Sequence, residues 1–181
     1  TIELASDVID MFQTGTGSTF RLATSQVFRD VSAWYHIVFS IDTTATQASN
    51  RIKIYINGSQ VGDFSTSTYP SLNADLEWNN TKEHDLGRRS DNVFYFDGYL
   101  SDVHFIDGQA LDPSRFGKQD ADGVWQPISY TGTYGTNGFH LDFADNSTAA
   151  ALGTDVSGNS NDWTPSGITT DDQVSDTPTV N

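Results

Sequence analysis

Apolar and polar residues alternate with a period of two along much of the chain, and this pattern predicts β-strands. Residues 34–42 place Tyr35, Ile37, Phe39 and Ile41 on one face. Residues 51–57 repeat the alternation with three isoleucines, Ile52, Ile54 and Ile56. Each segment therefore predicts a strand with one face turned to a core.

Turn signals separate the strands. Asn57-Gly58 predicts a tight hairpin, because both residues tolerate positive φ. We expect residues 61–64 to form the returning strand and the polar segment 43–50 to form a long loop. Further short strands are expected at 76–78, 84–87, 93–96, 99–106 and 139–143.

Helical signals are confined to residues 112–117. Asp112 suits an N-cap, Pro113 the first helical position and Gly117 the stop, which predicts about one turn. The pattern as a whole predicts an all-β, antiparallel two-sheet sandwich with at most short helical turns. We expect the core between the sheets to contain Ile37, Phe39, Ile41, Ile54, Ile56, Val103 and Phe105.

Charge narrows the classes of partner. The chain has 24 acidic and 9 basic residues, a formal net charge of −15. A nucleic-acid binder needs a cationic surface, and the densest basic spot is Arg88-Arg89. We therefore expect no nucleic-acid partner and no membrane insertion, since no apolar run reaches the roughly 18 residues of a span. The sequence has no cysteine, which excludes disulfides and thiolate metal sites.

Three stretches resemble the laminin-G/concanavalin A-like lectin/glucanase sandwich superfamily. The first is Trp34-Tyr35-His36-Ile37-Val38 with the later hairpin ending in Tyr55-Ile56-Asn57-Gly58. The second runs from Phe96-Asp97-Gly98 through Asp102-Val103-His104-Phe105 to Ala110-Leu111-Asp112-Pro113. The third is Asp155-Val156-Ser157-Gly158-Asn159-Ser160-Asn161-Asp162. The resemblance implies a concanavalin-like jelly roll.

The longer form of the second motif, with Tyr130-Thr131-Gly132 and residues 134–139, resembles bacteriophage tail-fibre-type proteins. Residues 176–179 are similar to the segment that precedes a second sandwich in such proteins. This resemblance implies a virion structural protein on the particle surface, with other virion proteins as partners and a homo-oligomeric parent.

The third motif is usual near the start of such domains, but here it lies near the end. Either the fragment lacks its first strands, or residues 139–163 belong partly to a neighbouring sandwich, or they close the same sheet in permuted order. We accordingly expect a sandwich over 1–118, a loop-rich extension over 119–163 that completes this sandwich or joins a neighbouring one, and an acidic linker over 164–181.

Catalytic patterns are missing from the sequence. Glycosidases need paired carboxylates, and none of the three glutamates, Glu3, Glu77 and Glu83, alternates with a second acid on a strand. No G-x-S-x-G elbow occurs. His36, His104 and His140 lie on strand faces, where we expect cross-strand partners or a binding face. No H-x-H or H-x-x-x-H pair supports zinc. We therefore expect no enzyme.

Two sets of residues are candidate binding sites. Asp142, Asp145, Asp155 and Asp162 offer oxygen ligands for calcium, the one cofactor considered; the alternative is a turn whose side chains bond their own backbone. Trp78, Tyr95 and Trp125 lie in or beside loops and could stack on sugars, although such rings also serve packing.

The sequence favours a non-catalytic adhesion module that recognises host-surface glycans. A ligand-free spacer or capping module, and a bacterial surface or secreted carbohydrate-binding domain, are the alternatives.

Overall fold

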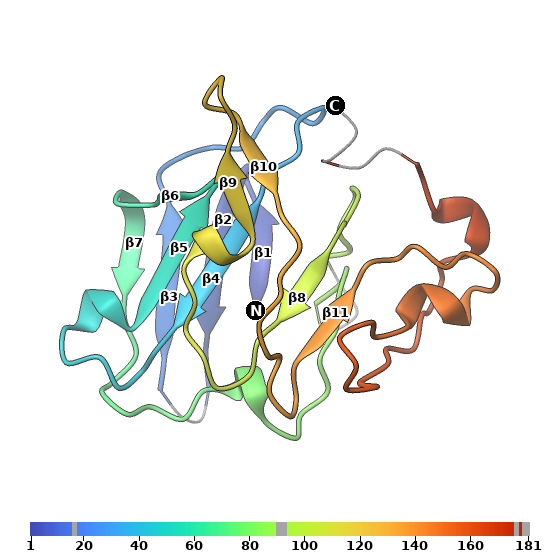
Figure 1. Ribbon diagram of the computed structural model, residues 1–181. Coiled ribbons are helices and arrows are strands. Elements are labelled where there is room, and N and C mark those ends of the chain that lie inside the picture. Colours follow the sequence, from blue (N-terminus) through green and yellow to red (C-terminus); the bar gives the residue numbers. More distant parts are fainter. Residues whose placement is uncertain (16–17, 90–93, 176–177, 179–181) are drawn as a thin grey trace. The chain divides into compact units, whose positions relative to one another are not determined.

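The computed structural model describes residues 1–15, 18–89, 94–175 and 178. The chain divides into two compact units. Unit 1 comprises Thr1–Asp97 and Ala110–Trp125, and unit 2 comprises Gly98–Gln109 and Gln126–Asn181. Each unit is described by itself (Figure 1).

The larger sheet of unit 1 has four strands in the order β1-β2-β3-β7, and every neighbouring pair is antiparallel. The strands are β1 (Ile2–Ala5), β2 (Val8–Gln13), β3 (Phe20–Thr24) and β7 (Phe64–Thr68). Ser6 and Asp7 join β1 to β2 with positive φ at both positions, which is the geometry of a two-residue hairpin turn. β1 and β7 form the two edges of this sheet.

The second sheet of unit 1 contains β4 (Ile37–Ile41), β5 (Ile52–Ile56) and β6 (Ser59–Gln60) in that order. β4 and β5 pair so that Ile37 lies opposite Ile56, Phe39 opposite Ile54 and Ile41 opposite Ile52. The predicted hairpin at Asn57-Gly58 is confirmed, with φ of 47° and 79° at these residues. The shared period-two face thus forms one continuous apolar surface.

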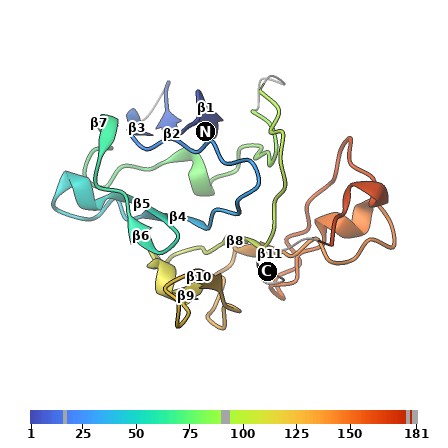
Figure 2. The ribbon, with the colours of Figure 1, turned by 90° about the horizontal axis from the view of Figure 1, so that it is seen from above.

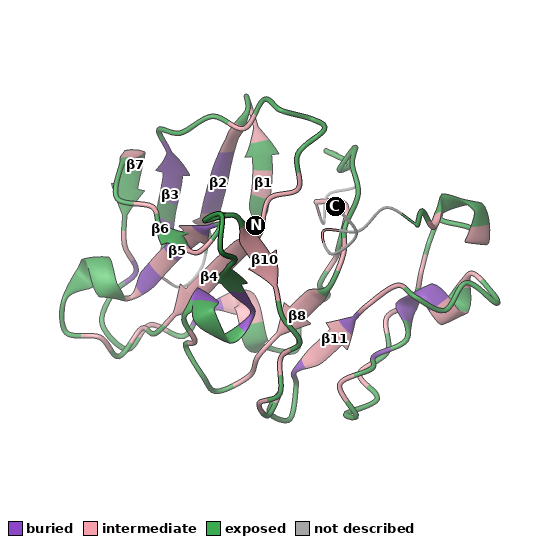
Figure 3. Ribbon diagram, turned by 45° about the horizontal axis from the view of Figure 1, so that its top comes forward, coloured by how far each residue is buried: buried purple, intermediate pink, exposed green. Residues whose placement is uncertain are grey.

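The two sheets of unit 1 pack face to face around one core, and Figure 2 shows them as two layers. The core joins the isoleucines of β5 to buried side chains of β2 and β3: Ile9, Met11, Phe20, Leu22, Ile52, Ile54 and Ile56. Figure 3 shows buried residues gathered on β2 and β3, whereas β1 is more exposed. The predicted all-β antiparallel sandwich is therefore confirmed.

Helical structure in the described residues is limited to short 3-10 turns, and among them no helix is long and apolar enough to cross a bilayer. The turns are η1 (Ala48–Asn50), η2 (Glu77–Asn79), η3 (Pro113–Arg115), η4 (Ala150–Gly153) and η5 (Thr170–Asp172). The turn predicted at 112–117 is confirmed as η3, because the Asp112 carboxylate accepts a hydrogen bond from the Ser114 amide. β9 (Gly117–Gln119) follows and pairs with β10 (Trp125–Pro127).

Unit 2 is built on one antiparallel pair, β8 (Val103–Phe105) with β11 (Phe139–Leu141). His104 lies directly opposite His140, and the Phe105 and Phe139 rings stack at 5.6 Å between centroids. The other described residues of unit 2 are the end of β10, the turns η4 and η5, and loops. Near its end the Gln173 side chain donates to the carbonyls of Phe143 and Ala144.

Several predicted details were wrong. The strand returning from the hairpin is Ser59–Gln60, not 61–64, because the two-residue turn brings the chain straight back beside β5. Residues 76–78 enter η2, while 84–87 and the described residues 94–96 are not strands. Val103 and Phe105 lie in unit 2 and are not part of the unit 1 core. Residues 93, 176, 177 and 179 lie outside the described residues.

The strands β1, β2, β3 and β7 were not predicted. The period-two signal in β2 is obscured because polar Gln13 is buried on the core face with Ile9 and Met11, while apolar Val8 and Phe12 share the outer face with Asp10. Asp10 is itself only 3% exposed. Its carboxylate accepts two hydrogen bonds from Arg21 Nε and one from Arg21 Nη2 at 2.6 Å. A paired charge thus lies on the outer face of this sheet.

Candidate functional site

The four aspartates proposed for calcium do not share one environment. Asp142 and Asp145 each accept a hydrogen bond from the backbone amide two residues ahead, as in Asx turns. Asp155 is 7% exposed, and its carboxylate accepts from the amides of His140, Ser157 and Asn161 and from the Ser157 hydroxyl. Asp162 accepts from the Asp155 amide at 2.9 Å. These bonds favour the turn interpretation, while calcium binding itself stays a prediction.

The turn around Asp155 also holds a neighbouring loop. Asn159 Nδ2 donates to the carbonyls of Gly135 and Gly138, and Asn161 Nδ2 donates to those of Thr136 and Gly138. The third sequence motif therefore serves as a polar clamp on the loop that leads into β11. Burial alone would raise the pKa of Asp155, but the hydrogen bonds from His140, Ser157 and Asn161 outweigh it, so this pKa lies below the ordinary value.

The three aromatic candidates lie in three different surroundings. Trp78 is half-buried and packs against the unit 1 core. The Trp125 ring covers the backbones of Gly58 and Gly117 so closely that a Cβ at either glycine would overlap it, and it lies 5.6 Å from the His36 ring. Tyr95 is 68% exposed and has the most accessible ring of the three. Only Tyr95 therefore presents an open face; whether any of the three binds a sugar stays a prediction.

A polar groove of about 330 Å³ lies in unit 1, where both sheets end in edge strands. β6 contributes Gln60 from one sheet, and β7 contributes Phe64 and Ser67 from the other. Asn50 and Lys53 come from η1 and β5, and Asp63 comes from the link between β6 and β7. A second pocket of about 370 Å³ shares residues 60–63 and is also lined by Ser25 and Gln26.

The chemistry of this groove suits a hydroxyl-rich ligand. It offers an amide from Asn50 and from Gln60, an ammonium from Lys53 and a carboxylate from Asp63, with the Tyr69 ring beside them. Within the described part of the chain, the side chains of Gln60 and Asp63 have no hydrogen-bond or ion-pair partner. These groups are therefore available to an external molecule.

Arg88 and Arg89 both form ion pairs with carboxylates. Arg88 forms ion pairs with Asp85 at 2.9 Å and Glu83 at 3.5 Å, and Arg89 with Glu3 at 3.7 Å. The Arg89 guanidinium also lies 4.3 Å from the Phe94 ring centroid. Neither arginine stands in a cationic field of the kind that phosphate binding requires.

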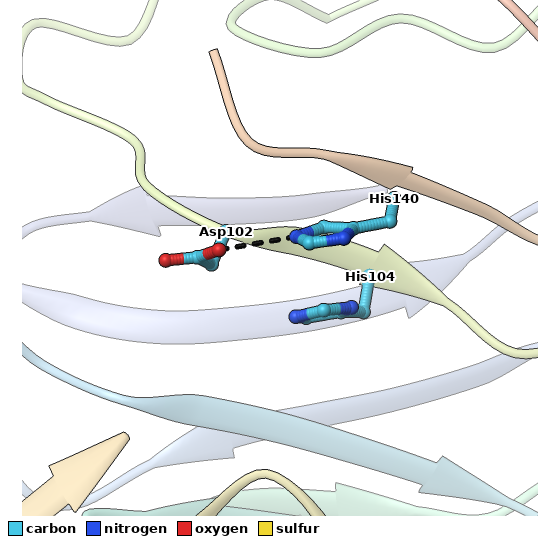
Figure 4. Close-up of side chains that lie close together, drawn as sticks. All are labelled: Asp102, His104 and His140. Atoms are coloured by element: carbon cyan, nitrogen blue, oxygen red, sulfur yellow. Dashed lines mark hydrogen bonds and ion pairs between the residues drawn. The ribbon is translucent and has the colours of Figure 1, made fainter. Parts of the chain in front are cut away.

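A second cluster lies at the β8–β11 pair of unit 2 (Figure 4). The His104 and His140 rings stack at 4.0 Å between centroids, and Asp102 Oδ1 lies 3.1 Å from His140 Nε2. Asp102 precedes β8 with φ of 50°, an uncommon conformation for a non-glycine residue that places it at the end of the stacked rings. His104 Nδ1 lies 2.9 Å from the Tyr134 hydroxyl.

The surroundings of the cluster shift the pKa values of Asp102 and Tyr134. The hydrogen bond from His140 lowers the pKa of Asp102 and outweighs the opposing effect of burial. Burial, reinforced by Tyr130, Asp155 and Asp102, raises the pKa of Tyr134 to about 12. Near neutral pH the site therefore combines a carboxylate, two imidazoles and a neutral phenol.

The sequence predicted that the histidines lie on strand faces, but it did not predict that His104 and His140 are in contact. His104 and His140 are 36 positions apart and meet because β8 and β11 pair in this register. The H-x-H and H-x-x-x-H patterns detect ligands that are close in sequence, so they miss a pair formed between two distant strands. The available signal was Asp102-x-His104 on one strand face and a single histidine on the other apolar strand.

Comparison with known families gave one match. A family model described as "Concanavalin A-like lectin/glucanases superfamily" covers residues 5–115, more than half of the chain. No curated protein and no solved structure matched the chain.

Proposed function

Because the chain belongs to the concanavalin A-like lectin/glucanases superfamily, we propose that it is a non-catalytic adhesion module of a phage virion protein, a tail fibre or head decoration, that recognises host-surface glycans. The observation that carries the glycan part is the polar groove at the paired sheet edges of unit 1. Its amide, ammonium and carboxylate groups complement sugar hydroxyls, and Gln60 and Asp63 have side chains free to donate or accept.

The groove is shallow, so each copy binds weakly. Few polar contacts and one flanking ring support a Kd of about 0.1–1 mM, or roughly −4 to −5.5 kcal/mol. Useful adhesion then requires several copies, whose effective concentration raises avidity without any new contact. A homo-oligomeric parent and other virion proteins as partners belong to the proposal for this reason.

The virion part is supported by the resemblance of residues 102–113, 130–132 and 134–139 to tail-fibre-type proteins. Its test is immunoelectron microscopy of purified phage particles, with an antibody against this domain. Label on tails or capsids supports the proposal. Label on the bacterial surface alone favours the bacterial or secreted alternative.

The glycan part is tested on an array, with the domain as a monomer and fused to a trimerising scaffold. We expect binding by the multimer that is lost in the double variant Gln60→Ala/Asp63→Asn. Gln119→Ala/Asp122→Asn is the matched control, because it changes the same residue types at exposed positions outside the groove. A Tyr95→Ala multimer tests the open ring separately.

Each array result has a defined meaning. Loss of binding in the groove variant but not in the control supports the groove. Equal binding by both variants, with loss in Tyr95→Ala, moves the site to the aromatic loop. Silence from every multimer favours the structural spacer, and release of shorter sugars from any array contradicts the non-catalytic assignment.

A further inference from the structure

The Asp102–His104–His140 cluster has the composition of a transition-metal site. Its three side chains each offer a ligand atom, and these atoms all lie within 4.8 Å of one another. Imidazoles bind metals in their neutral form, so one carboxylate and two coordinating imidazoles together carry a single negative charge, which suits a divalent ion. Imidazole nitrogen favours zinc and its first-row neighbours over calcium and magnesium, which prefer oxygen.

One pair of ligand atoms already has the separation expected in a bound state. Bonds of about 2.0–2.1 Å in a tetrahedron separate the ligand atoms by roughly 3.3 Å. Asp102 Oδ1 and His140 Nε2 already lie 3.1 Å apart. Figure 4 shows the two stacked rings pointing in the same direction, with Asp102 at one end. Stacked, nearly parallel rings direct their nitrogen lone pairs in parallel, so binding requires the His104 and His140 rings to rotate out of the stack until both lone pairs meet at one ion. The half-exposed Asp102 side chain can follow this rotation.

Neighbouring groups support this arrangement. A metal-binding histidine usually donates its other ring nitrogen to a partner that fixes the ring. His104 Nδ1 lies 2.9 Å from the Tyr134 hydroxyl, and when Nδ1–H donates, Nε2 carries the lone pair that coordinates a metal. The His140 backbone amide donates to the Asp155 carboxylate at 2.8 Å, and this bond holds β11 against the turn around Asp155. The Tyr134 ring is nearly parallel to both imidazoles, at interplanar angles of 20° and 7°.

We propose that Asp102, His104 and His140 bind one Zn²⁺ or a related borderline divalent ion, which cross-links β8 to β11. Three protein ligands leave a fourth position to water. The link joins strands of only three residues each, so the ion stabilises unit 2 by binding the folded state alone. The proposal is independent of glycan binding, because all three ligands and their supports lie in unit 2.

Calorimetric titration of the tag-free, chelator-treated domain with ZnCl₂ tests the proposal. We expect one high-affinity equivalent, with affinity reduced at least tenfold in His104→Gln and in His140→Gln. His84→Gln is the control, because His84 is exposed and lies outside the cluster, where its ring nitrogens contact the Lys82 and Glu77 carbonyls. Its affinity should stay within twofold of the unmodified domain.

Two further measurements keep the test valid if a variant is unstable. Co²⁺ should give the visible absorption bands of a tetrahedral site in the unmodified domain and not in His104→Gln. In the unmodified domain, ¹⁵N spectra should show Zn²⁺ shifting the Nε2 resonances of His104 and His140. Absence of a stoichiometric equivalent, shifts confined to other histidines, or affinity unchanged in both variants would overturn the proposal.

Discussion

Replacing Ile54 with alanine tests the core of unit 1. Ile54 is fully buried on β5, opposite Phe39 and among the side chains that join the two sheets. The change removes three methyl or methylene groups, a transfer loss of about 2.4 kcal/mol at about 0.8 kcal/mol each. The cavity left behind adds to this loss, so we expect unfolding to become easier by about 2–5 kcal/mol.

The assay is urea unfolding followed by both tryptophan fluorescence and far-ultraviolet circular dichroism. Trp34, Trp78 and Trp125 lie in unit 1 and report on it. Val31→Ala is the control, because Val31 is fully exposed and its loss should change stability by less than about 0.5 kcal/mol. A loss below about 0.5 kcal/mol for Ile54→Ala, with an unchanged denaturant slope, would refute the assignment of the core.

The remaining predictions concern turns and charge. Gly58→Ala should lower the free energy of unfolding by more than about 1 kcal/mol, because φ at Gly58 is positive and an added Cβ would overlap the Trp125 ring. Gly62→Ala is the control, because an added Cβ there meets open space. Equal unfolding midpoints for the two variants would contradict the prediction. Asp155 has a pKa below the ordinary 3.8, so it stabilises unit 2 above that pH, and the effect is lost as pH falls through the lower folded-state pKa. Acid titration followed by Trp163 fluorescence should show a smaller loss in Asp155→Asn; superimposable profiles would refute the role of this carboxylate. Asn161→Ala should speed hydrogen exchange in residues 136–138 by removing the clamp, and unchanged exchange there would refute it.

The part of the fold with a clean period of two could be predicted from the sequence. The β4–β5 pair follows directly from alternating isoleucines and the Asn57-Gly58 turn. In β2 the alternation is broken by apolar Phe12 on the outer face and by polar Gln13, which is buried on the core face. The Gln13 side chain is satisfied by the distant Glu77 amide, a contact that leaves no local signal, so the strand was missed.

In the candidate sites, too, local features could be predicted from the sequence, whereas contacts between distant residues could not. Asx turns at Asp142, Asp145 and Asp155 are local, and the sequence already held them as the alternative to calcium. The packing of Trp125 on Gly58 joins residues 67 positions apart and could not be anticipated. Likewise, the histidine cluster depends on strand register, and the groove depends on two sheet edges that meet only in the folded chain.

The central claim is that the unit 1 groove binds a glycan without cleaving it. The most direct measurement is a ¹H–¹⁵N titration of the isolated domain with the best array ligand, followed by analysis of the recovered sugar. The account predicts fast-exchange shifts concentrated at residues 49–53 and 60–67, a Kd of about 0.1–1 mM and an intact ligand. Shifts confined to other parts of the domain, or shortened sugar in the recovered sample, would contradict it.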